Sequence, residues 1–278
     1  MVLLVRLYAH FVALHSCINS PKQYHPVIMS VKWCSMKCKG CGEDKDLIKA
    51  HIIPKSFYMN LKGDSKYLNV IHSNADARVG ISHIGDYDKE ILCKACDGVF
   101  EKYDDYAKKF LIDEFGSFNE LWDGETLVGW EVDGCKHQKL ILFFLSVLWR
   151  ASVSNRENYR NIVLGPHEDK IKEIVFGRSN DNLYYTCSLA KFYGAKIDTL
   201  ERAILNPVRI KIDGINFHQI YLGGFIAYLK VDKRENPMGD KLDIRVGQKL
   251  HIVGRSFDNS KEYKLIQKIV SQPIADKL

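Results

Sequence analysis

Two Cys-x-x-Cys pairs are the residues whose type and spacing most directly suggest chemistry. Cys38 and Cys41 form the first pair, and Cys93 and Cys96 form the second. Two thiolates three residues apart can occupy one edge of a Zn²⁺ tetrahedron, and two such pairs complete a closed structural site. The spacing therefore predicts one zinc ion that brings the two ends of segment 41–93 to one point. Chance spacing among the eight cysteines is the alternative interpretation.

A histidine lies between the two pairs, on a segment that we expect to be a strand. Residues 47–53 are rich in isoleucine, and Pro54 stops the strand pattern. A histidine placed near a zinc site can act as a general base, or it can simply pack or hydrogen bond within the strand. His51 is therefore the first candidate catalytic residue.

The order of strand, loop and helix between the cysteine pairs resembles the HNH group of His-Me finger (ββα-metal) endonucleases. The resemblance is carried by the first pair, by Ala-His-Ile-Ile-Pro at 50–54 and by Ile-Leu-Cys-x-x-Cys-Asp at 91–97, and it covers roughly residues 34–110. It implies a zinc-stapled ββα domain that hydrolyses phosphodiester bonds with one divalent metal ion, Mg²⁺ or Mn²⁺. It also implies a nucleic-acid partner, DNA more than RNA, and a setting such as bacterial defence.

The resemblance further implies roles for single residues. His51 matches the general base that takes a proton from the attacking water. Asp88 matches the position that braces the loop, and Asp97 matches the metal ligand at the start of the helix. Glu101 lies four residues further on, so both carboxylates can hold one hard cation. A solvated acidic helix face, with its first acids favoured by the helix dipole, is the alternative.

Ala50 departs from the pattern of the group. Many members have an acidic residue or a histidine there that also binds the metal, and alanine cannot do so. Water and phosphate oxygens would then complete the shell of a weakly held Mg²⁺. Alternatively, the chain is a catalytically inactive, zinc-finger-like module that binds nucleic acid or a protein.

The composition is typical of a soluble globular protein. Of its 278 residues, 46% are hydrophobic and 27% are charged, and the net charge of +6 is in the direction that favours nucleic acid. The cysteines resemble metal ligands plus free thiols, which is typical of a reducing compartment, so we expect a cytoplasmic protein. No apolar stretch has the length of a membrane span, so we expect no membrane partner.

The remaining patterns predict an α+β protein. We expect a peripheral extension at 1–28, a zinc-bound HNH-like domain at 29–116 and a mixed helical and β-sheet domain of unknown role at 117–278. Helices are expected at 97–116, 139–152, 167–176 and 260–271. Strands are expected at 47–53, 77–84, 183–188, 206–213, 215–221, 223–231 and 242–253, and the rest of 59–86 is expected to be loop.

Overall fold

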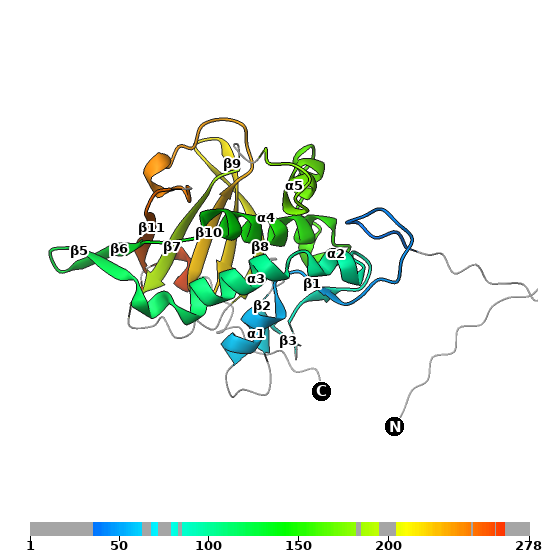
Figure 1. Cartoon of the computed structure of the whole chain (residues 1–278). Helices are drawn as coiled ribbons and strands as arrows, with labels where there is room; N and C mark the ends of the chain where they lie inside the picture. Colours follow the sequence, from blue (N-terminus) through cyan, green and yellow to red (C-terminus); the bar gives the residue numbers. More distant parts are fainter. Residues whose placement is uncertain are drawn as a thin grey trace, which may run out of the picture. The chain divides into compact units, whose positions relative to one another are not determined.

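The structure is a mixed α+β fold in which most strands join one large sheet (Figure 1). It is a computed structural model that describes residues 36–62, 68–71, 79–82, 85–181, 185–194, 204–245, 247–258 and 260–264. Residues 35–278 form one compact unit. The extension predicted at residues 1–28 lies outside the described residues.

The large sheet contains seven strands. In spatial order they are β5 (Asn119–Asp123), β6 (Thr126–Val132), β11 (Leu250–Ser256), β7 (Cys187–Tyr193), β10 (Phe225–Lys230), β9 (Ile215–Leu222) and β8 (Ile204–Ile212). Neighbours are antiparallel except β11 and β7, which run parallel with Ile252 opposite Leu189. Strand β11 therefore joins the β5–β6 hairpin to the rest of the sheet.

Helix α4 (His137–Val153) lies at the centre of the hydrophobic core. Every residue from Leu140 to Ala151 is buried, as an almost continuously apolar helix requires. It packs against α3 (Glu101–Lys108) and α5 (His167–Val175), and it crosses one face of the large sheet (Figure 1). The predictions of a buried helix at 139–152 and of a further helix at 167–176 are therefore confirmed.

Short elements make up the part of the chain that contains the cysteine pairs. They are β1 (Ala50–His51), α1 (Lys55–Lys62), β2 (Leu68–Ile71), β3 (Val79–Ser82), β4 (Tyr87–Asp88) and α2 (Lys94–Gly98). Strand β1 pairs antiparallel with β4, and β2 pairs antiparallel with β3. Two backbone hydrogen bonds, from Lys39 to Ile91 at 2.8 Å and from Ile48 to Leu92 at 2.9 Å, connect the first cysteine pair and the segment after it to the residues just before the second pair.

Four short helical segments that are not α-helical add to the secondary structure of the described residues. The segment η1 (Lys109–Asp113) is a π-helix, and three others are 3₁₀ turns: η2 (Phe115–Ser117), η3 (Glu157–Tyr159) and η4 (Asp240–Leu242). The predicted helix at 97–116 is therefore wrong as a single element. The chain breaks after α2, resumes as α3 and then widens into η1.

The strand predictions differ in accuracy. Those at 206–213, 215–221 and 223–231 are confirmed by β8, β9 and β10, and the one at 77–84 by β3. The strand expected at 183–188 begins at Cys187 and runs further, and the one expected at 242–253 begins only at Leu250, after η4. The strand expected at 47–53 reduces to β1 and a single bridge from Leu47 to Cys93. Of the helix expected at 260–271, only a turn at 261–264 is described.

The larger of two hydrophobic clusters runs through both parts of the described chain, and the smaller one contains residues of the large sheet such as Phe192 and Ile226. Ile52 and Phe100 from the cysteine-containing part belong to the same buried cluster as Phe143 and Leu229. The predicted boundary between residues 116 and 117 stays a prediction, and residues on both sides of it contribute to this core. In the described part of the chain, no helix has the length and apolar character needed to cross a membrane.

Candidate metal centre and the histidine beside it

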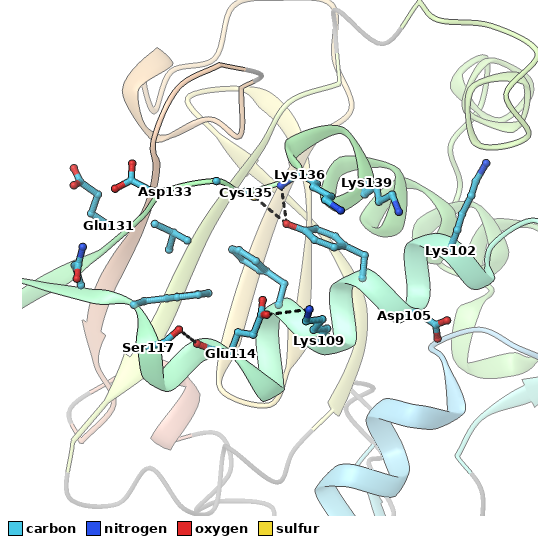
Figure 2. Close-up of a pocket in the computed structure, with 16 residues that line it drawn as sticks. Lys102, Asp105, Lys109, Glu114, Ser117, Glu131, Asp133, Cys135, Lys136 and Lys139 are labelled. Carbon is cyan, nitrogen blue, oxygen red and sulfur yellow. Dashed lines mark hydrogen bonds and ion pairs between the residues drawn. The ribbon is translucent and has the colours of Figure 1, made fainter.

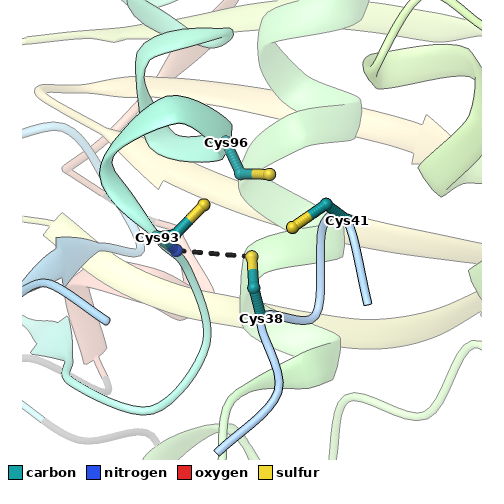
Figure 3. Close-up of side chains that lie close together, drawn as sticks. All are labelled: Cys38, Cys41, Cys93 and Cys96. Carbon is teal, nitrogen blue, oxygen red and sulfur yellow. Dashed lines mark hydrogen bonds between the residues drawn. The ribbon is translucent and has the colours of Figure 1, made fainter. Parts of the chain in front are cut away.

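The four predicted cysteines meet at one point (Figure 3). Their Sγ atoms all lie within 4.8 Å of one another. A tetrahedral Zn²⁺ with bonds of about 2.3 Å requires sulfur–sulfur separations of about 3.8 Å, which small side-chain rotations can reach from this arrangement. Cys38, Cys93 and Cys96 are buried, and Cys41 is half-buried. The spacing of the pairs therefore predicted a real cluster that can bind one zinc ion.

Local backbone geometry explains how the cluster forms. The backbone N–H of Gly42 donates to the carbonyl of Cys38 at 2.8 Å, which closes the first knuckle. Gly40 must lack a side chain, because a Cβ there would lie 2.8 Å from the Cys96 sulfur. The N–H of Cys93 donates to the Cys38 sulfur at 3.3 Å and so links the two pairs (Figure 3).

The four thiols of the cluster can all ionise only when a cation is bound among them. Burial raises the pKa of the Cys38 thiol, and backbone N–H groups outweigh that effect and lower the pKa to about 7. Burial and the neighbouring sulfurs raise the pKa of Cys96. The protein alone therefore favours one thiolate, and a bound metal ion would supply the positive charge that four thiolates require.

Asp97 lies beside this cluster, and His51 lies close enough to Asp97 for their charges to interact. His51 ends β1 and is half-buried, with its ring 5.9 Å from the ring of Tyr87. Asp97 follows Cys96 directly in α2. Burial raises the pKa of Asp97, while the positive charges of Arg150 and His51 partly oppose the rise. The second cysteine pair, which Asp97 follows, and the β1–β4 pairing therefore bring the predicted base close enough to the predicted carboxylate for their charges to interact.

Arg150 is a residue of this region that sequence reasoning did not assign to it. Its side chain is only 2% exposed, and it donates two hydrogen bonds to Asp104 at 2.9 and 3.1 Å. It also donates to the backbone carbonyl of His51 at 3.0 Å. A planar guanidinium matches a carboxylate in this way, so Arg150 ties α3, α4 and β1 together. An arginine within an apolar helix is the sequence signal that such a partner must exist.

Asp88 forms hydrogen bonds to the segment that follows α4. It is buried, and its carboxylate accepts from the N–H of Glu90 at 2.8 Å, the Ser154 hydroxyl at 2.7 Å and the N–H of Asn155 at 3.1 Å. These bonds hold the chain between β4 and Cys93 in place. The structure gives Asp88 a bracing contact, and its part in catalysis stays a prediction.

Glu101 is exposed on α3, and Ala50 has no exposed surface. An acid at position 50 would therefore have to be buried, at a large cost unless it were paired. Among the described residues, the cysteine cluster is the one group of three or more metal-binding side chains found within reach of a common ion. His51, Asp97 and Glu101 therefore do not form a preorganised metal site with three protein ligands.

Basic and aromatic side chains border His51. The Lys49 ammonium lies 5.6 Å and the Arg156 guanidinium 6.0 Å from the centre of the Tyr87 ring. Arg156 also pairs with the buried carboxylate of Asp86 at 2.9 Å. Cations beside a strand-end histidine are suitable for contact with phosphate groups.

Comparison of the chain with family models, with curated proteins and with solved structures yields no match. The class that the fold and site define is therefore a mixed α+β protein with a four-cysteine centre that can bind zinc.

Proposed function

We propose that the chain is a metal-dependent endonuclease of the HNH type, with a structural Zn²⁺ held by Cys38, Cys41, Cys93 and Cys96. The observation that carries the proposal is that Asp97, which directly follows the cluster residue Cys96 in α2, lies close enough to His51 at the end of β1 for the two charges to interact. Lys49 and Arg156 support it, because they put positive charge where a phosphate backbone would lie.

Each residue of the proposed site would have its own role. His51 would accept the proton of the attacking water at its imidazole. Asp97 and Glu101 offer hard oxygen ligands suited to Mg²⁺ or Mn²⁺, and Mg²⁺ commonly keeps several waters, so two carboxylates are enough. When bound, the cation would stabilise the charge that develops on phosphate. Arg150 would fix the strand end through the His51 carbonyl.

The test is cleavage by the purified chain. We expect it to nick or degrade DNA in Mg²⁺ or Mn²⁺, and we expect His51→Ala to slow cleavage by about 100-fold or more, as loss of a general base does. His251→Ala is the control, since this histidine pairs with Glu131 on the large sheet. Zinc content and circular dichroism must be unchanged in both variants. Cleavage that does not depend on His51 contradicts the proposal.

The zinc part has its own test. One Zn²⁺ per chain is expected by elemental analysis, and Cys93→Ser should abolish binding, whereas Cys135→Ser should leave it intact. Absence of zinc from protein purified without chelators contradicts this part alone.

A second candidate is a catalytically inactive zinc module that binds nucleic acid or a protein partner. The buried Ala50 and the lack of a preformed third ligand beside His51 favour it. No cleavage of DNA or RNA in either metal, with binding retained, would select this candidate.

A further inference from the structure

A deep cleft lies away from the cysteine cluster and from His51. It has a volume of about 740 Å³ and opens between α3, η1, the β5–β6 hairpin and the start of α4 (Figure 2). This volume is within the range of about 300–1,000 Å³ that is typical of ligand sites. No residue named above as a candidate ligand or base lines it.

Lysines line the cleft from two sides. Lys102 and Lys109 come from α3 and η1, while Lys136 and Lys139 come from the start of α4 (Figure 2). Lys109 pairs with Glu114 at 3.2 Å. Among the described residues, Lys102, Lys136 and Lys139 form no ion pair, so their charge is available to a ligand.

The acids at the other end of the cleft share a lysine partner. Glu131 and Asp133 both pair with Lys249, at 2.5 and 3.6 Å. Glu114 pairs with Lys109, and of the four acids that line the cleft only Asp105 forms no ion pair among the described residues. Lys102, Lys136 and Lys139 therefore leave the lining with an excess of positive charge. Such an excess favours an anionic ligand.

Aromatic rings form the floor. Tyr106 and Phe118 are half-buried, and both rings pack against Phe110, with centroids 5.8 and 4.9 Å away. The Tyr106 hydroxyl accepts a hydrogen bond from the Lys136 N–H at 2.7 Å, which fixes the ring beside the lysines. The floor also contains a π-helical segment, η1, and π-helical turns often mark functional sites.

We infer that this cleft binds a single-stranded segment of nucleic acid. Lysines that follow a backbone and aromatic rings that accept bases are the two features that single-strand sites combine. From Lys102 to Lys109 the helix advances about 10 Å, the length of roughly three stacked nucleotides. A flat lysine surface without rings would fit duplex backbone better, and the aromatic rings on the floor favour a strand with unpaired bases.

Helix α3 connects the cleft to the residues of the proposed function. Glu101, a proposed metal ligand, lies four residues before Asp105, which lines the cleft, so both lie on the same side of α3. A strand held in the cleft would thus lead toward the proposed catalytic residues. The choice of nucleic acid as ligand rests on the proposed function, whereas the cleft itself does not.

Fluorescence polarisation with a labelled oligothymidine of about twelve nucleotides tests the inference, in buffer without Mg²⁺ or Mn²⁺ so that no cleavage occurs. The test variant is Lys102→Gln/Lys136→Gln/Lys139→Gln. The matched control is Lys211→Gln/Lys241→Gln/Lys261→Gln, which removes the same charge from exposed positions outside the cleft.

We expect the cleft variant to bind at least about tenfold more weakly and to lower the slope of log K against log salt by about 2, since each phosphate contact on a single strand contributes about 0.7. The control should change affinity less than about twofold. A duplex of the same length should bind more weakly than the single strand, and thymidine monophosphate should not displace the strand.

Three results would overturn the inference: equal losses in both triple variants, equal binding of duplex and single strand, or displacement by the mononucleotide alone. Cleavage assays separate it from the proposed function. Strand binding through the cleft without any His51-dependent cleavage removes the nuclease proposal and keeps the inference. If the cleft variant cleaves as fast as the unmodified protein, the nuclease proposal stands and the inference about the cleft is removed.

Discussion

At the scale of single residues, Arg150 is the charge on which the candidate site depends. Its guanidinium contacts Asp104, the His51 carbonyl and the face of Phe100, 5.0 Å from the ring centre. The cysteine spacing and His51 could be read from the sequence, because ligand spacing is local. Arg150 could not, because its partner lies 46 residues away and only the packing of α3 on α4 brings the two together.

We predict that Arg150→Met destabilises the fold by about 3 kcal/mol, because it leaves the Asp104 carboxylate, whose side chain is 15% exposed, without its partner. Urea unfolding measures this loss. The double variant Arg150→Met/Asp104→Asn should recover part of the stability, since it removes the unpaired charge. A double variant as unstable as the sum of both single variants would mean that the pair does not couple.

His218 is a buried residue that should make stability depend on pH. Its ring nitrogens have no hydrogen-bond partner among the described residues, and burial, with the charges of Arg209 and His167, lowers its pKa to about 4. The unfolded histidine has a pKa of about 6.5 and takes up a proton first as the pH falls. The neutral ring therefore supports folding fully above pH 6.5, and this support is lost between about pH 6.5 and 4.

The prediction is that His218→Leu weakens the acid sensitivity of folding. The free energy of unfolding of the unmodified protein should fall by about 2 kcal/mol more between pH 7 and pH 5 than that of the variant. Urea titrations of both proteins at the two pH values measure this difference. The contributions of carboxylates and cysteines that both proteins share cancel in the comparison. Equal pH dependence of the two proteins would show that His218 is not buried as a neutral ring.

At the scale of elements, the sequence predicted those whose pattern is self-contained. Strands β8, β9 and β10 are separated by short turns that contain glycine, and α4 is apolar along most of its length. The β5–β6 hairpin was missed, although Asp123-Gly124 is a strong turn signal and Gly124 has the positive φ of +59° that such turns use. Strand β1 came out shorter than expected, because its ladder partner β4 has only two residues.

Strand β4 should depend on the segment that follows α4, through Asp88. We predict that Asp88→Ala lowers the free energy of unfolding by about 2–3 kcal/mol, because Ser154 and the N–H of Asn155 lose a charged acceptor in a buried place. Asp181→Ala, at an exposed carboxylate, should change it by less than about 0.5 kcal/mol. Chemical denaturation compares the two, and equal effects would remove the bracing role.

At the scale of the whole molecule, the cysteine centre and the large sheet share one core, in which Phe100 and Trp149 are packed with centroids 6.2 Å apart. Loss of a metal ion bound at the cluster should therefore lower stability in parts of the sheet far from it. An independent zinc domain would instead unfold by itself and leave the sheet intact. The predicted boundary at residue 116 can be tested by this difference.

We predict that Cys38→Ser destabilises the whole unit in one transition. Amides of β9 and β10, which lie in the sheet and not at the cluster, should exchange faster in native-state hydrogen exchange, because a single cooperative unit lowers its protection everywhere. Cys135→Ser, which changes a half-buried thiol outside the cluster, should leave these amides protected. Exchange that accelerates only within 36–116 would instead identify two domains that fold separately, with α4 as the surface on which the first one docks.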